Sequence, residues 1–273
     1  MLCLLRTTIA LVLWHLVRAA QWSQSDTRCR ELVVDAGFNI GQDTAMYLEA
    51  GYRVVAIEAD TQLVQWALHY EFFHYAIKQK RLILLNRAIV GDGVMQHNVS
   101  FHINPCSREL SALNAAHLGA CDRPIQTISV RPITCAQILR TYPGALYVKI
   151  DIEGQDNDCI RSILHYVRSG GLPPRYMSTE SGWNGGLFKE YFQSGYTKFK
   201  FTAQLVHENH SAGTGAFGEF ALDIWSNYVW RTYDEIYLGA RKGELHVKFD
   251  PVTHHGFCDE VLSAGKFGKS WPF

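Results

Sequence analysis

Residues 33–44 read VVDAGFNIGQDT: a short apolar run, a turn between two glycines, and the start of a helix. Gly37 and Gly41 let the backbone of this turn come close to a ligand, and the helix that follows points free amide groups toward it. The next apolar run, residues 53–58, ends in Glu58, about 20 residues after Gly37, a spacing at which an acidic residue bonds ribose hydroxyls. Together these features predict a strand–turn–helix unit that holds a nucleotide-like ligand.

Along the rest of the chain, apolar strand-like runs alternate with helix-like runs, as in a parallel α/β sheet. We expect further strands over residues 81–85, 145–151, 176–181 and 198–203, and helices over 42–50, 60–75 and 226–240, besides one that ends at Gly170. Residues 94–103 predict an inserted hairpin arm. The irregular stretch 104–124 is too long for a simple connection, so we expect it to contact ligand.

Five motifs follow one another between about residues 30 and 220: VVDAGFNIGQDT (33–44), AIEAD (56–60), NRAIVGDG (86–93), KIDIEGQD (149–156) and GTGAFGE (213–219). With these motifs the chain resembles the FkbM family of S-adenosylmethionine-dependent O-methyltransferases. It departs from the family at Gln155-Asp156, where a second Glu is common. The resemblance implies a Rossmann-like, seven-stranded class I methyltransferase fold, with a mostly parallel sheet and helices on both faces.

The resemblance also implies S-adenosyl-L-methionine as cofactor. We expect it to be bound by Asp35, Gly37, Asn39, Gly41, Glu58 and Asn86. An acid just before the turn repels a pyrophosphate but suits the ammonium group of a sulfonium amino acid. The turn reads GxxxG and not GxGxxG, which disfavours a nicotinamide-dependent oxidoreductase.

The run KIDIEG (149–154) supplies the candidate catalytic residues. Alternate residues of a strand share a face, so Lys149, Asp151 and Glu153 are expected to point the same way, and buried charges are costly unless used or paired. Asp151 is the first candidate for orienting or deprotonating an acceptor hydroxyl, and Glu180 is the second. For Lys149 and Glu153 an internal ion pair with a supporting role is the alternative to catalysis.

The expected reaction is methyl transfer to a hydroxyl of a glycan or a small molecule. No metal is strictly required, because alignment and proton removal are the main contributions to such a displacement; divalent-cation use stays open, and we assign no metal ligand. The competing function is a secreted binding protein that keeps the fold without the chemistry. Lys+Arg 26 balance Asp+Glu 26, so we expect no nucleic-acid partner.

The first 20 residues have the layout of a secretory signal peptide: Arg6, an apolar run over 7–17, then Ala19 and Ala20. We expect cleavage there, a single domain over residues 21–273, and a lumenal or secreted protein without integral membrane association. A retained anchor and organelle targeting are the alternatives. The sequons at Asn98 and Asn209 fit a lumenal chain and predict a glycoprotein.

Six cysteines remain after such a cleavage: Cys29, Cys106, Cys121, Cys135, Cys159 and Cys258. In an oxidising compartment they allow up to three disulfides, and the sequence does not give their pairing. Cys135 and Cys159 sit among apolar helix positions, so free buried thiols are the alternative for these two. No CxxC pair occurs, which argues against a zinc site.

Overall fold

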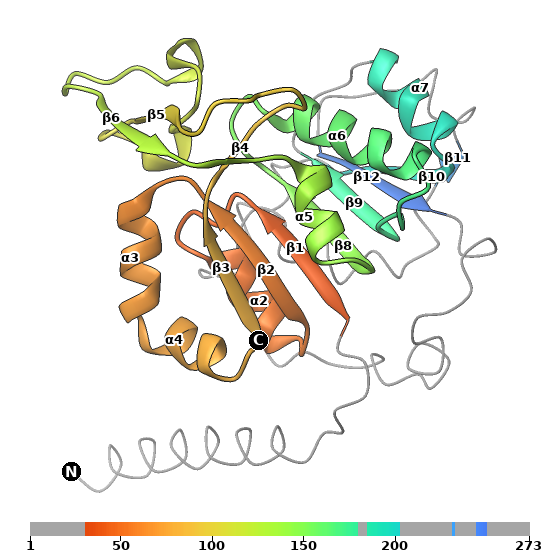
Figure 1. Cartoon of the computed structure of the whole chain (residues 1–273), viewed down its shortest axis with the longest axis horizontal. Coiled ribbons are helices and arrows are strands. Elements are labelled where there is room, and N and C mark those ends of the chain that lie inside the picture. The colour runs from red at the N-terminus through yellow and green to blue at the C-terminus, as the bar shows by residue number, and fades with distance from the viewer. Residues whose placement is uncertain (1–30, 180–184, 203–230, 233–243, 250–273) are drawn as a thin grey trace, which may run out of the picture. The chain divides into compact units, whose positions relative to one another are not determined.

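The computed structural model describes residues 31–179, 185–202, 231–232 and 244–249 (Figure 1). All of them belong to the compact unit that begins at Glu31. The predicted signal segment, the motif at 213–219, Glu180, Asn209, Cys29 and Cys258 lie outside the described residues. Nothing in the structure tests the expectations placed on them.

One sheet of eight strands organises the described residues (Figure 1). Their spatial order is β11 (Arg231–Thr232), β10 (Tyr196–Thr202), β12 (Glu244–Phe249), β9 (Tyr176–Thr179), β8 (Ala145–Ile150), β1 (Leu32–Ala36), β2 (Arg53–Glu58) and β3 (Leu82–Asn86). The five strands from β3 to β9 are parallel, whereas β12 is antiparallel to both of its neighbours. The predicted mostly parallel α/β sheet is confirmed, and a two-residue edge strand, β11, brings the expected seven strands to eight.

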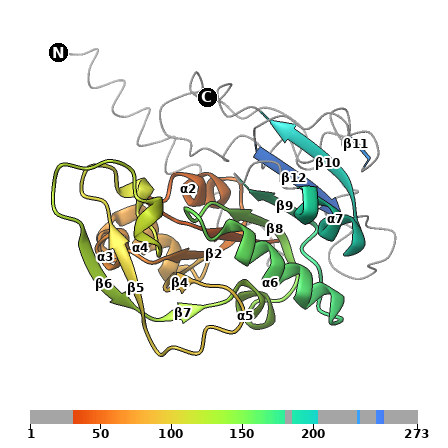
Figure 2. The same ribbon diagram turned by 90° about the horizontal axis from the view of Figure 1, so that it is seen from above.

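Helices cover both faces of the sheet, as predicted (Figure 2). Helices α2 (Gln42–Glu49), α3 (Thr61–His69) and α4 (Glu71–Lys78) share one apolar core with Val33 of β1. Helices α5 (Cys135–Thr141), α6 (Asp156–Arg168) and α7 (Gly185–Gln193) share a second core with Val34. Neighbouring residues of β1 thus pack on opposite faces, which explains why its sequence is a continuous apolar run.

Two helix predictions need correction. The helix expected over 60–75 is broken at Tyr70, which is extended (ψ 121°) and separates α3 from α4. Its predicted cap is confirmed, because the Asp60 side chain accepts a hydrogen bond from the backbone N–H of Gln62 at 2.8 Å. The helix expected over 226–240 is wrong at Arg231–Thr232, which pair with β10 as a strand.

An arm is inserted between β3 and α5. It holds the parallel pair β4 (Ala88–Ile89) and β7 (Pro132–Ile133) and the antiparallel pair β5 (Val99–Ile103) and β6 (Gln126–Val130). The hairpin expected over 94–103 is therefore half right, because the partner of β5 comes from beyond residue 124. Residues 104–124, which we call the strap, join these two strands and contain the short 3₁₀ helices η1 (Arg108–Leu110) and η2 (Ala115–His117).

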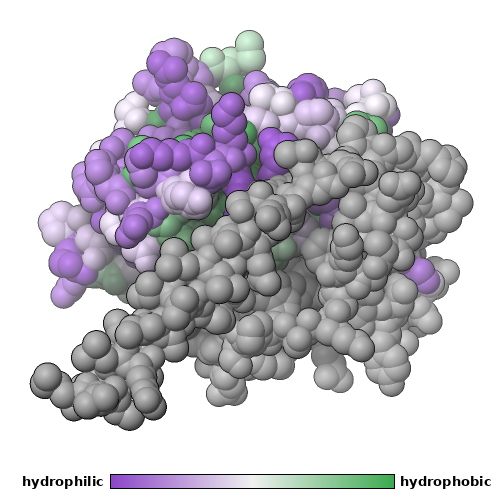
Figure 3. Space-filling model, turned by 90° about the horizontal axis from the view of Figure 1, so that it is seen from below, coloured by the Kyte–Doolittle hydropathy of each residue, from purple (hydrophilic) through white to green (hydrophobic). Residues whose placement is uncertain are grey.

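Hydrophilic side chains cover most of the described surface that is visible in Figure 3. Among the described helices, none combines the length and the apolar character needed to cross a membrane.

Candidate active site

The sheet changes winding direction at β1. Strands β2 and β3 follow on one side of β1, and β8 and β9 follow on the other. The connections that leave two such neighbouring strands diverge, and ligands collect in the crevice at their carboxyl ends. A cavity of about 540 Å³ lies at this place, lined by residues from the turn after β1, the end of β2, the strap and the loop after β8. Its volume is in the usual range for small-molecule sites. We call it the central cavity.

The turn after β1 forms one wall of the central cavity through Gly37, Phe38 and Asn39. Gly37 has φ +98°, and a Cβ atom there would lie 1.8 Å from the carbonyl oxygen of Asp151. Only glycine therefore allows the turn to lie against the loop after β8. Gly41 also has positive φ and is buried behind the wall, where a Cβ atom would overlap the rings of Phe38 and Phe73.

Glu58 ends β2 and lines the central cavity. Its two carboxylate oxygens accept hydrogen bonds from the backbone N–H groups of Asn39 and Asp60, each at 2.7 Å. Burial raises the pKa of Glu58 to about 7, although these two hydrogen bonds act in the opposite direction. Each oxygen of a carboxylate has two acceptor positions, so hydroxyl groups of a ligand can bond to Glu58 without displacing the backbone.

Asn86 supports this wall from behind and is not among the residues that line the cavity. Its side-chain amide donates to the carbonyl oxygens of Glu58 and Ala59, at 3.0 and 3.1 Å. Its side-chain oxygen accepts from the hydroxyl of Thr61. Asn86 thus holds the end of β2 beside the end of β3.

Lys149 lies at the centre of a buried ionic cluster beneath the cavity. Its ammonium nitrogen is 3.2 Å from an oxygen of Asp35, 3.5 Å from Asp43 and 3.6 Å from Asp151. It also donates to the carbonyl oxygen of Gly37 at 2.7 Å. Burial alone would lower the pKa of Lys149, but the three carboxylates raise it by more than burial lowers it. The net shift of the pKa is therefore upward, and the lysine stays charged. Lys149 is ion-paired, but these three carboxylates differ from Glu153, the partner expected in that alternative, and one of them is an aspartate that the sequence did not single out.

That aspartate, Asp43, is buried in the first turn of α2 and lines the central cavity. Burial raises its pKa to about 6, and Lys149 opposes the rise. Acids are common in the first turn of any helix because of the helix dipole. The sequence therefore carries no signal that distinguishes Asp43 from an ordinary helix-terminal acid.

Asp35 does not occupy the place expected for it. It is fully buried, accepts a hydrogen bond from the Thr44 hydroxyl at 2.5 Å, and does not line the cavity. The ammonium group beside it is that of Lys149.

Asp151 and Glu153 both line the central cavity. Asp151 follows the last residue of β8, and its side chain is 25% exposed. Glu153 lies beyond the strand in a left-handed conformation, with φ 44°. The alternation of a strand therefore does not govern Glu153, and the loop after β8 brings it to the cavity.

The strap forms the remaining wall, and the contact with ligand expected of residues 104–124 stays a prediction. Arg108, Leu110 and Ser111 line the cavity. Arg108 donates through Nε to Asp60 at 3.0 Å and through Nη2 to the same oxygen. This ion pair ties the strap to the beginning of α3.

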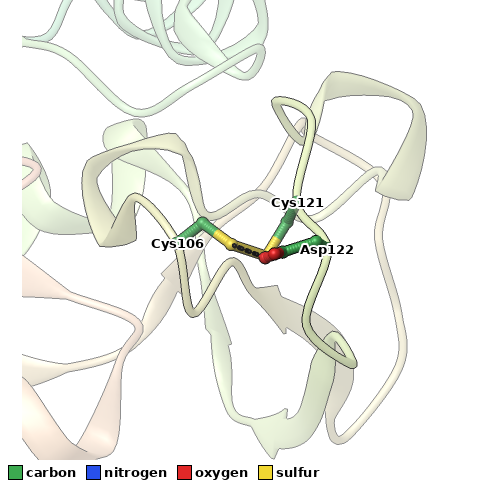
Figure 4. Close-up of side chains that lie close together, drawn as sticks. All are labelled: Cys106, Cys121 and Asp122. Atoms are coloured by element: carbon green, nitrogen blue, oxygen red, sulfur yellow. Dashed lines mark hydrogen bonds between the residues drawn. A yellow bond between two sulfur atoms is a disulfide. The ribbon is translucent and has the colours of Figure 1, made fainter.

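A disulfide between Cys106 and Cys121 closes the strap on itself (Figure 4). Asp122 lies beside it, with a carboxylate oxygen 3.4 Å from the Cys106 sulfur. These three side chains are close enough to hold a metal ion, but a disulfide offers no thiolate ligands. The strap also contacts the loop after β8, since a Cβ atom on Gly154 would lie 1.8 Å from the His117 ring.

A second disulfide joins Cys135 of α5 to Cys159 of α6. Both residues are buried, as expected, but the alternative of two free thiols is wrong.

Comparisons with known proteins give only distant similarity. No protein-family model matches the sequence, and no curated protein matches it. Among solved structures the chain is similar to precorrin-6y C5,15-methyltransferase from Geobacter metallireducens GS-15, with 12% identity, 86% of this chain and 87% of that chain covered, and a TM-score of 0.33. It is similar to a delta-N METTL16 MTase domain, with 11% identity, coverage of 83% and 75%, and a TM-score of 0.38. A predicted O-methyltransferase from Agrobacterium tumefaciens gives 11% identity, coverage of 89% and 92%, and a TM-score of 0.33. Similarity at this level assigns neither activity nor substrate to the chain.

Proposed function

We propose that the chain is an S-adenosylmethionine-dependent O-methyltransferase that acts on a hydroxyl group of a glycan or a small molecule. One observation carries the proposal: the central cavity brings together the glycine turn after β1, the carboxylate of Glu58 and the carboxylate of Asp151. These groups come from three parallel strands and meet at the switch point of the sheet. Membership of the FkbM family remains part of this proposal and is supported by the motifs quoted above.

The chemistry of the cavity fits the cofactor. Five acidic and three basic side chains line it, which favours a ligand with net positive charge, such as a sulfonium amino acid. In this proposal Glu58, at the end of β2, accepts hydrogen bonds from the ribose hydroxyls of the cofactor. Gly37 has no side chain that could intrude into the cavity, and its close approach to the carbonyl oxygen of Asp151 leaves no room for one.

In the proposed reaction the bound cofactor supplies a methyl group to an acceptor oxygen. Asp151 holds the acceptor hydroxyl and receives its proton, because its carboxylate is partly exposed in the cavity while Lys149 fixes it from below. Asp43 and Asp35 keep Lys149 in place and neutralise its charge. Glu180, the second candidate for the base, lies outside the described residues.

The proposed compartment is the lumen of the secretory pathway or the outside of the cell. The described residues contain two disulfides, and such bonds form and persist mainly in oxidising compartments. The predicted signal segment supports the same proposal.

Calorimetric titration with S-adenosylmethionine, S-adenosylhomocysteine and NAD tests the function. We expect binding of the first two and none of NAD. Glu58→Ala should weaken binding at least tenfold, because it removes charge-assisted hydrogen bonds, each of about 1.5–3 kcal/mol. The matched control is Glu49→Ala, at an exposed position near the end of α2, and should bind as the wild type does. Binding of NAD, or equal affinities for Glu58→Ala and wild type, would contradict the assignment.

A further inference from the structure

A second hollow adjoins the central cavity. Its volume is about 890 Å³, and it is lined by α6 and Gln155 before it, by residues of the segment 90–100, by the strap and by Glu190 of α7. It shares two lining residues, Leu113 and Gln155, with the central cavity. We call it the outer groove.

One wall of the outer groove is a single face of α6. Asp158, Arg161, Ser162, His165 and Arg168 line it at helical spacing. An outward polar face is ordinary for a helix, but this face has a second wall opposite. The segment 90–100 provides that wall, so these side chains border a recess instead of open surface.

The two walls are joined by fixed contacts. The hydroxyl of buried Ser162 donates to Asp92 at 2.7 Å and accepts from the backbone N–H of Ala136 at 2.9 Å. Gly91 approaches α6 so closely that a Cβ atom there would be 3.4 Å from the Asp158 carboxyl carbon. These contacts fix the two walls relative to each other, and they do not depend on a ligand.

The side chains of the groove offer donors and acceptors in similar numbers. Arg161, His165 and Arg168 supply donors, and Asp92, Asp158 and Glu190 supply acceptors. Arg161 lies 3.9 Å from Asp158 and 3.6 Å from Glu190, so much of the positive charge is already balanced. A hydroxyl group both donates and accepts, and a chain of hydroxyls suits such a lining better than an anion or an apolar molecule.

The length and direction of the groove point to an extended ligand. Gln155 immediately precedes α6, and Arg168 is its last residue, so the lined face is about 20 Å long. The groove meets the central cavity at Gln155 and Leu113, which line both. A chain lying along α6 has its end directed toward the cavity that contains Asp151.

We infer that the outer groove binds a neutral, polyhydroxylated chain of the oligosaccharide class, whose terminal hydroxyl enters the central cavity past Gln155. This inference rests on the proposed function, because it takes the methyl donor to occupy the central cavity. It narrows the acceptor to an extended carbohydrate and excludes a compact apolar metabolite.

The probe is an array of neutral oligosaccharides (glucans, chito-oligosaccharides and oligomannosides) exposed to the labelled, disulfide-intact protein. The test variant carries Arg161→Ala and His165→Ala together. The control is Lys189→Ala, which removes an exposed cation of α7 outside the groove. We expect the wild type and the control to bind at least one member of the array, and the double variant to bind about tenfold more weakly.

Failure of the wild type to bind any neutral oligosaccharide, or equal binding by the double variant, overturns the inference. Titration of the same three proteins with S-adenosylmethionine separates the two proposals. Cofactor binding without oligosaccharide binding overturns the groove and leaves the proposed function standing. Oligosaccharide binding that the double variant loses, without cofactor binding by the wild type, confirms a carbohydrate site and contradicts the methyltransferase.

Discussion

Replacing Glu58 by Gln should change how the stability of the protein depends on pH. The pKa of Glu58 is raised from 4.5 to about 7 in the folded protein, first by burial. Below pH 4.5 the carboxyl group is protonated in both the folded and the unfolded chain, so the full stability of the fold with a protonated Glu58 is present. As the pH rises toward 7, the unfolded chain ionises first, so the stability that the protonated group contributes is progressively lost.

The size of this loss follows from the two pKa values. One pH unit between them corresponds to about 1.4 kcal/mol. The free energy of unfolding of the wild type should therefore fall by about 3 kcal/mol relative to Glu58→Gln between pH 4.5 and pH 8. Glutamine has no titrating group and loses a hydrogen bond to the backbone N–H of Asn39 or Asp60, but that loss is the same at every pH.

Urea unfolding at a series of pH values, with the disulfides intact, measures this difference. Asp43 and the other buried groups titrate in both proteins and cancel in the comparison. Glu49→Gln, at an exposed position, should stay parallel to the wild type throughout. A constant offset between wild type and Glu58→Gln, within about 1 kcal/mol from pH 4.5 to pH 8, would refute the raised pKa and with it the burial argument for Glu58.

Lys149→Met should destabilise the protein by about 3–5 kcal/mol at pH 8, because buried carboxylates such as Asp43 lose their counter-ion. Urea unfolding measures this loss, and a loss below about 1 kcal/mol would contradict the prediction. Asp151→Asn should bind S-adenosylmethionine as the wild type does and lose roughly 10²–10⁴ in turnover on an oligosaccharide found with the array; full turnover would move the base elsewhere. The double substitution Cys106→Ser and Cys121→Ser should lower the free energy of unfolding by about 3 kcal/mol, the scale for a loop of this length. It should also weaken cofactor binding in calorimetry, since the strap forms a wall of the cavity, and unchanged affinity would show that the strap holds its place without the disulfide.

The central half of the sheet was predictable because its signals are local. Strands β1, β2 and β8 are apolar runs with an acid at or next to their last residue, and the glycines of the turn after β1 mark its close approach to a neighbour. The cap at Asp60 has the same local character, since its partner is two residues away. Such features depend on interactions within one strand or one turn, and these can be read from the sequence.

The rest of the site depends on contacts between distant parts of the chain. Arg108 and Asp60 are 48 residues apart, and no pattern in either neighbourhood indicates their pairing. The strand at Arg231–Thr232 exists because β10 offers it an edge, and this tertiary contact overrides the helical pattern around it. The pairing of Cys135 with Cys159 likewise follows from the packing of α5 against α6, which the spacing of the cysteines does not reveal.

The bond between Cys135 and Cys159 closes a covalent ring that contains all of β8. The strand that carries Lys149 is therefore part of the closed loop between the two tethered helices, which cannot separate from each other while the disulfide is intact. Local opening that exposes β8 must work against this tether as well as against the two neighbouring strands. The amide protons of β8 should therefore exchange with solvent more slowly than those of β3, which lies at the edge of the sheet. Reduction of the disulfide between Cys135 and Cys159 should make the two exchange rates more similar.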